Sequence, residues 1–99
     1  MGFRIPSKFS LGGLNYEVKI TPELNNGEDY GEWDGAGCVI TIAERARLDH
    51  LSRERMEQVF CHELTHAILN FIGNEKLNDN EVFVDTFSQG LYQAIKTME

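Results

Sequence analysis

The stretch Cys61-His62-Glu63-Leu64-Thr65-His66-Ala67-Ile68-Leu69 decides how the rest of this 99-residue chain is understood. It contains a His-Glu-x-x-His sequence within a run of apolar residues whose spacing is typical of a helix. In a helix, His62 and His66 are four residues apart, so both project from one face with one turn between them. Two imidazoles in that arrangement can bind the same metal ion.

Zinc suits nitrogen ligands of this kind, with bonds of about 2.0 to 2.1 Å. Glu63 lies beside the first histidine and can reach a water molecule in an open coordination position, so it is the candidate general base. The alternative is that His62 and His66 are ordinary surface or core residues with an incidental glutamate between them. The helical context favours the metal site.

The sequence around the motif predicts one long helix. Ser52 is a good N-cap residue, no proline interrupts the residues after it, and Gly73-Asn74 provides a stop. The apolar residues of this segment recur at helical spacing: Met56, Val59, Phe60, Leu64, Ala67, Ile68 and Phe71. The predicted helix therefore runs from near Ser52 to Gly73.

The residues before this helix predict a small sheet built from two hairpins. Gly12-Gly13 separates residues 9–11 from residues 14–20, in which apolar and polar residues alternate and give one apolar face. An Asp-Gly turn at residue 34 joins residues 30–33 to residues 38–42 in a second hairpin. Residues 1–8, 23–29 and 43–51 are interpreted as an irregular lead-in, a polar loop and a connector. We expect three or four antiparallel strands, with Trp33 as a partly buried packing residue and not a substrate-stacking one.

A second helix is predicted after a polar turn at residues 74–80. Asn78 is the expected N-cap, and Glu81, three residues later, completes a capping box. The apolar stripe of this helix is Val84, Phe87, Leu91, Ile95 and Met98, whereas Glu81, Asp85, Ser88 and Tyr92 share another face. A short connection makes the second helix pack back antiparallel on the first, with its first turns near His62 and His66. Residues 1–99 are thus predicted to form one α+β domain, a small sheet followed by two packed helices.

A catalytic zinc site needs a third protein ligand and an open position for water. Glu81 and Asp85 are four residues apart on one face, so one can bind the metal while the other accepts a hydrogen bond from a ligand histidine. The alternatives are a capping carboxylate for Glu81 and an exposed surface acid for Asp85. Tyr92, His50 and Tyr30 are candidate oxyanion stabilisers, and nothing in the sequence selects among them.

His62-Glu63-Leu64-Thr65-His66 followed by Glu81-Val82-Phe83-Val84-Asp85 resembles the H-E-x-x-H plus E-x-x-x-D arrangement of the gluzincin metallopeptidases. The order of a small sheet, a motif helix and one further helix is similar to minimal phage-encoded relatives of the ImmA/IrrE metallopeptidases. The resemblance implies a minimal zincin-like fold in which His62, His66 and Glu81 bind zinc. It also implies that Glu63 is the base and Asp85 a supporting residue, with Asp85 the alternative third ligand.

Charge and cysteine content narrow the classes of partner and the compartment. The formal net charge of -7 argues against nucleic acid as the main partner, since phosphate contacts need clustered Lys and Arg. The sequence has no signal-peptide pattern and no apolar run long enough to cross a bilayer. Its two cysteines, Cys38 and Cys61, form no C-x-x-C pair, so we expect a reduced, cytoplasmic protein. Cys61 is expected to face the packing and not the metal, because adjacent helix positions point about 100° apart.

Two functions are compatible with this pattern. The first is a zinc metallopeptidase that hydrolyses peptide bonds of a protein substrate, with Glu63 activating a water molecule on the metal. The strand expected at residues 39–42 would offer an open edge to an extended peptide. The second is a zinc-stabilised regulatory or interaction module that cleaves nothing, for which Glu63 has no task. The sequence does not predict the oligomeric state.

Overall fold

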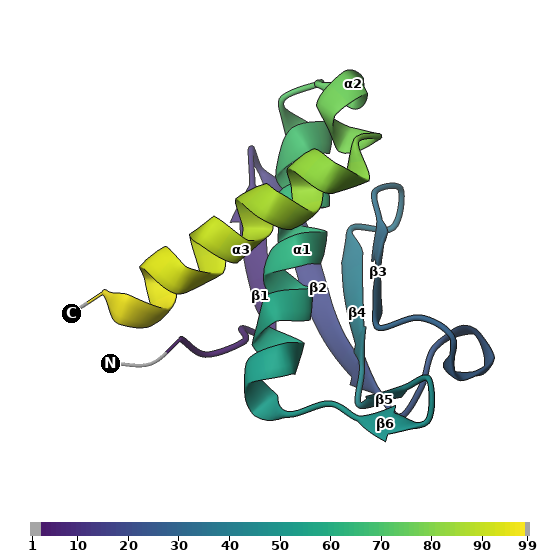
Figure 1. Cartoon of the computed structure of the whole chain (residues 1–99). Coiled ribbons are helices and arrows are strands. Elements are labelled where there is room, and N and C mark those ends of the chain that lie inside the picture. The colour runs from purple at the N-terminus through teal and green to yellow at the C-terminus, as the bar shows by residue number, and fades with distance from the viewer. Residues whose placement is uncertain (1–2, 99) are drawn as a thin grey trace.

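The computed structural model describes residues 3–98 and confirms the α+β class. Strands β1 (Lys8–Leu11), β2 (Leu14–Thr21), β3 (Gly31–Asp34) and β4 (Val39–Ala43) form one sheet, and β5 (Arg45–Ala46) and β6 (Asp49–His50) form a second, two-stranded one. A 3-10 turn, η1 (Asn25–Gly27), precedes β3, and the helices α1 (Arg53–Phe71), α2 (Glu75–Asn78) and α3 (Glu81–Thr97) follow the strands. Figure 1 shows α1 lying across the large sheet, with α3 on its other side. Within residues 3–98, none of the helices combines the length and the apolar character needed to cross a membrane.

The large sheet is mixed, which corrects the expectation that all of its strands are antiparallel. Both predicted hairpins form, β1 with β2 and β3 with β4, but they join through a parallel pair of β2 and β4. The strand order is β1-β2-β4-β3. Strand β4 is one of the two central strands, and its Ile40 and Ile42 are fully buried in the core that α1 covers. The edge strand beside α1 is therefore β3. The prediction that residues 39–42 form an open edge is wrong.

Two further details of the strands differ from the expectation. On β2 only Tyr16 is fully buried, whereas Leu14 and Ile20 are about half exposed, so the helix layer covers the middle of this strand. The expected connector at residues 43–51 contains the β5-β6 hairpin. Its two turn residues, Arg47 and Leu48, have φ values of 53° and 74°, as a tight two-residue hairpin turn requires.

Helix α1 begins and ends where the sequence predicts. The Ser52 side chain accepts a hydrogen bond from the backbone N–H of Arg55 at 3.0 Å, which caps the first turn. At the other end the chain leaves the helix through Gly73, whose φ of +75° is the left-handed conformation typical of a helix stop. The motif residues therefore lie in an uninterrupted helix.

The core lies between α1, the sheet and α3. Its buried members are Ile40, Ile42, Val59, Phe60, Cys61 and Tyr92. Phe3, before β1, stacks on Phe60 and meets Tyr92 edge-on, so the N-terminal segment closes the core beside α3. Cys61 is fully buried, as expected of a packing residue, and burial raises the pKa of its thiol to about 11.

The connection between the two long helices differs from the prediction. The expected polar turn contains α2, which is capped by Asn74 and ends at Asn78. Helix α3 is capped by Asn80, whose side chain accepts a hydrogen bond from the N–H of Phe83 at 3.0 Å. The predicted N-cap at Asn78 is therefore wrong by two residues, and Glu81 is the first residue of α3 and not a capping-box carboxylate.

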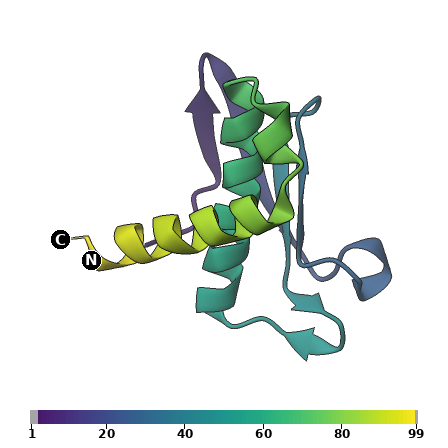
Figure 2. The ribbon, with the colours of Figure 1, turned by 45° about the horizontal axis from the view of Figure 1, so that its top comes forward.

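Helix α3 crosses α1 obliquely and does not lie antiparallel beside it (Figures 1 and 2). Its buried residues are Val84, Ser88 and Tyr92. The predicted apolar stripe is only partly covered, because the oblique crossing leaves Phe87 and Met98 exposed.

A buried carboxylate, Glu57, ties α1 to α3. Its Oε1 accepts hydrogen bonds from the Tyr92 hydroxyl at 2.8 Å and from the Lys96 ammonium at 2.9 Å, and Arg53 lies 3.9 Å from its Oε2. Burial raises the pKa of Glu57, but the hydrogen bonds and the two positive charges outweigh it, so the pKa lies below the ordinary value of glutamate. The ionised form of Glu57 therefore stabilises the packing of the two helices.

We expect Glu57→Gln to lower the free energy of unfolding by about 1 to 3 kcal/mol at neutral pH, because the charged acceptor of two hydrogen bonds is lost. A pKa that is lower in the folded than in the unfolded state stabilises the protein above the unfolded-state pKa. That stabilisation disappears as the pH falls through the folded-state pKa. Urea unfolding between about pH 7 and about pH 2 should show the difference between parent and variant shrinking with acid. The exposed Glu54→Gln, on the same helix, is the control, and a difference independent of pH would contradict the assignment.

Candidate metal centre

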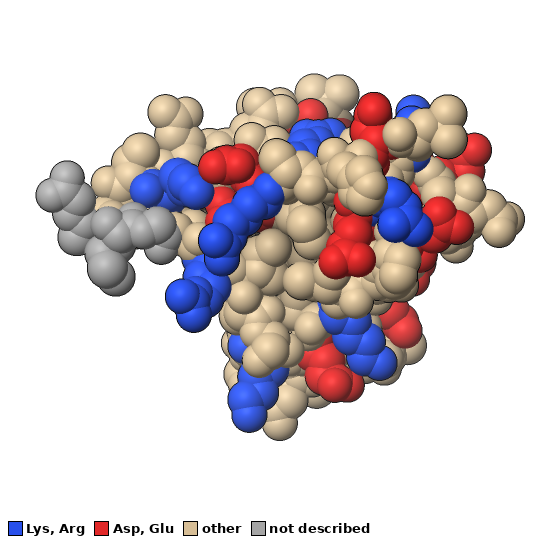
Figure 3. Space-filling view, turned by 90° about the horizontal axis from the view of Figure 1, so that it is seen from below, with Lys and Arg blue, Asp and Glu red and all other residues tan. Residues whose placement is uncertain are grey.

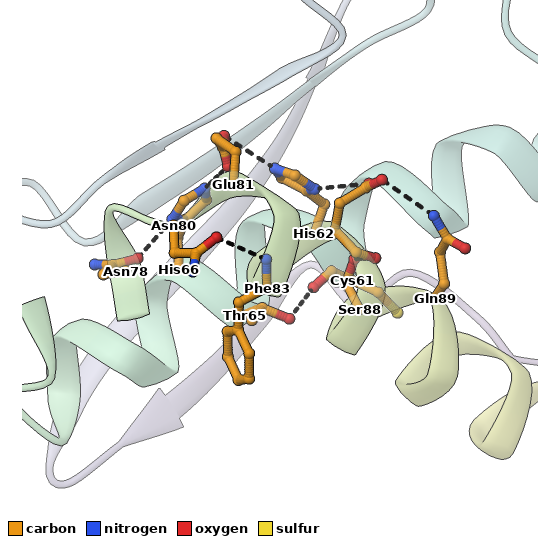
Figure 4. A network of polar contacts seen from close by, with 11 residues as sticks. Cys61, His62, Thr65, His66, Asn78, Asn80, Glu81, Phe83, Ser88 and Gln89 are labelled. Carbon is orange, nitrogen blue, oxygen red and sulfur yellow. Dashed lines mark hydrogen bonds and ion pairs between the residues drawn. The ribbon is translucent and has the colours of Figure 1, made fainter. Parts of the chain in front are cut away.

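Two helices bring the predicted ligands together. His62 and His66 come from consecutive turns of α1, and Glu81 is the first residue of α3. One donor atom from each of the three lies within 4.8 Å of the others. Figure 4 shows the two imidazoles and the Glu81 carboxylate directed toward one another. Asn78, the last residue of α2, contacts His66, so the chain begins α3 beside the two histidines.

Two of the distances between these donor atoms are close to the ligand spacing of a tetrahedral zinc ion. The two carboxylate oxygens of Glu81 lie 3.7 Å from Nε2 of His62 and 3.5 Å from Nε2 of His66. With metal bonds of about 2.0 to 2.1 Å, neighbouring ligands of a tetrahedral ion are about 3.3 Å apart. Small adjustments of the side chains would therefore give zinc three protein ligands, two imidazoles and one carboxylate.

Asp85 lies one turn further along α3 and faces the other nitrogen of His62. Its Oδ1 is 3.6 Å from Nδ1 of His62, and its Oδ2 accepts a hydrogen bond from Gln89 at 3.1 Å. A carboxylate in this position favours the tautomer that carries its proton on Nδ1, which leaves Nε2 free for a metal. Between the two acids considered from the sequence, the geometry favours Glu81 as ligand and Asp85 as support.

Asn78 supports the second histidine, and sequence reasoning missed this contact. Its Oδ1 lies 2.6 Å from Nδ1 of His66. The sequence predicted Asn78 as a helix cap, whereas it closes α2 and points its amide at the site. The available signal was Asn74, a good N-cap four residues earlier, which starts the short helix that carries Asn78. Both ligand histidines therefore have an oxygen beside Nδ1 and present Nε2 to Glu81.

Trp33 on the edge strand β3 packs against the site. Its ring stacks on the imidazole of His66 with centroids 5.9 Å apart and an interplanar angle of 17°. Trp33 also packs against the core, as the packing interpretation expects, and its buried Nε1 has no hydrogen-bond partner among the described residues. The stack restricts rotation of the His66 ring, so Trp33 helps to orient a candidate ligand.

Glu63, the candidate base, is a buried carboxylate on the same helix as the histidines. Only 9% of its surface is exposed. Burial raises its pKa to about 7; the nearby His66 lowers the pKa, and the carboxylates of Glu81, Glu32 and Asp29 raise it. Its environment therefore differs from that of the exposed acids elsewhere on the surface.

The absence of a side chain at Gly31 lets the edge strand approach Glu63. A Cβ atom at Gly31 would lie 2.6 Å from Cγ1 of Val59 and 3.3 Å from Cγ of Glu63. Val59 is packed in the core and Glu63 is buried, so a side chain at residue 31 would push the strand away from both. Strand β3 can therefore run directly over Glu63 because residue 31 is glycine.

A cleft of about 800 Å³ lies over Glu63. Its walls come from β3 with the loop before it, from α1 and from α3, and they include His62, Glu63 and Glu81. Clefts of this size bind small molecules or short stretches of peptide. The site therefore combines a metal-ligand set, a buried carboxylate and room for a substrate.

The three candidate oxyanion stabilisers differ in whether they line the cleft and whether their donor group is already hydrogen-bonded. The ring of Tyr92 lines the cleft, but its hydroxyl donates to Glu57, and burial together with this bond raises the pKa of Tyr92. His50 is exposed on β6 and is not part of the cleft wall. Tyr30 lines the cleft and makes no side-chain hydrogen bond within residues 3–98. Of the three, Tyr30 is the one free to donate to a bound substrate.

Comparisons with protein-family models, with curated proteins and with solved structures gave no significant match.

Proposed function

We propose that this protein is a zinc-dependent metallopeptidase of the His-Glu-x-x-His type that hydrolyses peptide bonds of a protein substrate. The observation that carries the proposal is the position of Glu63. This carboxylate is buried at the floor of a cleft, between the two ligand histidines in sequence and beneath a strand edge. Burying an acid there costs free energy, and a catalytic base explains why the chain retains it.

Each residue of the site has a task in this proposal. His62, His66 and Glu81 would hold the metal, with Asp85 and Asn78 orienting the two imidazoles. When bound, zinc would supply a Lewis acid that polarises the substrate carbonyl and lowers the pKa of a bound water from about 15.7 towards 7. Glu63 would accept a proton on its carboxylate as the nucleophile forms and return it to the leaving amine.

The free edge of β3 supports a peptide as the substrate. Tyr30 and Gly31 line the cleft, and β3 is paired only on its β4 side within the described residues. An extended peptide that adds to this edge forms main-chain hydrogen bonds and passes over Glu63. The proposed activity is the one that the resemblance to gluzincins and to the phage-encoded relatives of the ImmA/IrrE metallopeptidases implies. The proposed docking edge for the peptide is β3 and not residues 39–42.

The placement of the ligands also supports a second function. His62 and His66 belong to α1 and Glu81 to α3, so a metal would tie together two helices of a small domain. A regulatory or interaction module would use the metal for stability alone. Glu63 would then have no chemical task, which is why its substitution separates the two functions.

A cytoplasmic location belongs to the same proposal. Cys38 and Cys61 are both free thiols, and Cys61 is fully buried in the core.

Figure 3 shows acidic and basic side chains interspersed on the face seen from below, an arrangement unlike a broad basic surface. We therefore propose a protein or peptide partner, and neither nucleic acid nor a membrane.

Cleavage of defined peptides tests the proposed function. The protein loaded with zinc is incubated with a mixture of unstructured synthetic peptides, and mass spectrometry detects new termini. We expect cleavage at recurring positions that a zinc chelator stops and added zinc restores. The variant His66→Ala, purified in the same way, controls for contaminating peptidases. Products that appear equally with His66→Ala, or no chelator-sensitive product from any peptide, would contradict the proposal.

A further inference from the structure

Two arginines in the cleft share one aromatic ring and have no acidic partner among the described residues. The guanidinium carbons of Arg47 and Arg55 lie 5.9 Å and 4.9 Å from the centroid of the Tyr30 ring. All three residues line the same cleft as Glu63. The ion pairs formed within residues 3–98 include neither arginine. We call Tyr30, Arg47 and Arg55 the arginine end of the cleft.

Most hydrogen-bond donors at the arginine end have no partner within residues 3–98. A guanidinium over an aromatic ring is attracted to the face of the ring through its positive charge. Its N–H groups can still donate hydrogen bonds to other partners. Arg55 donates from Nη1 to Gln58 at 3.3 Å, and Arg47 donates from Nε to the backbone carbonyl of Glu28 at 3.3 Å. The remaining donors match the two oxygens of a carboxylate, which arginine binds bidentately.

The two arginines are held at a fixed place relative to the metal centre. Arg55 is seven residues before His62 on α1, so both share a helix face and lie about 10 Å apart along the axis. Arg47 sits in the β5-β6 turn, where its backbone N–H donates to the carbonyl of Gly27 at 2.7 Å. At about 3.3 Å per residue, 10 Å corresponds to about three residues of extended peptide.

The charge of the cleft differs between its two ends. The whole chain has 9 Lys and Arg and 16 Asp and Glu, so it is acidic. Two arginines without an ion pair in one cleft are therefore an exception to the charge of the chain. Lys96 also lines the cleft, but Glu57 already binds it. Glu28 and Asp29 lie at the cleft wall without forming an ion pair with either arginine. The metal-ligand end, in contrast, carries Glu63, Glu81 and Asp85.

We propose that the cleft selects peptides with an acidic side chain two or three residues from the bond that is cleaved, and that Arg47 and Arg55 bind its carboxylate. The position of that bond rests on the proposed peptidase function, whereas the preference for an acidic peptide does not. A bidentate carboxylate contact in a partly exposed cleft corresponds to about a tenfold gain in affinity over the matching amide.

Peptide binding without turnover tests this preference. The probes are fluorescein-labelled ten-residue peptides of Ala, Ser and Leu with one Glu placed at each position in turn, each with a Gln twin. Fluorescence anisotropy measures their affinity for the Glu63→Gln variant loaded with zinc. We expect the best Glu peptide to bind about tenfold more tightly than its twin, and this advantage to weaken with salt. The double variant Arg47→Gln/Arg55→Gln should lose the advantage.

Arg45→Gln is the matched control, because Arg45 pairs with Glu23 and does not line the cleft. It should keep the advantage of the Glu peptide, and Arg55→Glu should transfer the preference to a Lys peptide. Equal affinity for the twins, an advantage that survives the double variant, or no binding of any peptide would overturn the inference. If the parent protein cleaves no peptide but the preference for the Glu peptide remains, the proposed peptidase function is wrong and the inferred binding preference is retained.

Discussion

Glu63→Gln should reduce the rate of peptide hydrolysis by a factor of about 10² to 10⁴ and leave zinc binding unchanged. The amide has nearly the same shape as the carboxylate, so it preserves the packing against Gly31. It cannot accept a proton at neutral pH, so the proposed base is lost. The measurement is kcat/KM on a peptide that the parent protein cleaves, together with the zinc content of the variant.

Glu44→Gln is the control for this substitution, since Glu44 is exposed and lies outside the cleft. It should behave as the parent protein in both measurements. Turnover of Glu63→Gln at the parent rate would refute the catalytic role. An interaction module, by contrast, predicts that Glu63→Gln retains both the metal and the binding of its partner, with no hydrolysis by the parent to lose.

Asn78→Ala should weaken zinc binding by about 10-fold to 100-fold, although Asn78 is not itself a ligand. Its side chain lies 2.6 Å from Nδ1 of His66 and is the oxygen acceptor there. Without that acceptor, the tautomer with a free Nε2 is no longer favoured, and the ring is oriented by the stack on Trp33 alone. The loss of zinc affinity therefore measures how much Asn78 contributes by orienting His66.

The affinity in this experiment can be read from tryptophan fluorescence, because Trp33 is the single tryptophan and stacks on His66. The protein is titrated with zinc in the presence of a competing chelator of known affinity. Asn70→Ala, an exposed asparagine near the end of α1, is the control and should bind zinc as the parent does. Equal affinity of Asn78→Ala and the parent would show that the contact with His66 has no role in the site.

The elements that the sequence predicts well are those with local signals. Helix α1 follows from Ser52, a long helical pattern and Gly73, all of which act within a few residues of the helix ends. The two hairpins follow from Gly12-Gly13 and from the turn after Asp34, which determine strand pairing without distant contacts.

The elements that the sequence predicts poorly depend on distant or competing contacts. The parallel pairing of β2 with β4 arises because Ile40 and Ile42 must be buried, and no turn connects these strands directly. The start of α3 was misplaced because Asn74, Asn78 and Asn80 are all good N-cap residues. The structure uses the first and the last of them as caps.

The same contrast applies to the candidate site. His62, Glu63 and His66 come from one contiguous motif, and Glu81 lies near the histidines, as the short connection between the two helices predicts. The contribution of Asn78 depends on α2, and the commitment of the Tyr92 hydroxyl depends on Glu57, 35 residues away. Asn74 signals the short helix that carries Asn78, but no local pattern indicates that Asn78 contacts His66 or that Tyr92 contacts Glu57.

Metal content tests the central claim most directly. The chain is purified without added metal and without a histidine tag, and plasma mass spectrometry measures the metal bound per chain. We expect close to one zinc per chain, and its loss in His62→Ala and in His66→Ala. If the purified protein holds no metal and added zinc does not raise its thermal stability, the group formed by His62, His66 and Glu81 is not a zinc site and the proposed function is wrong.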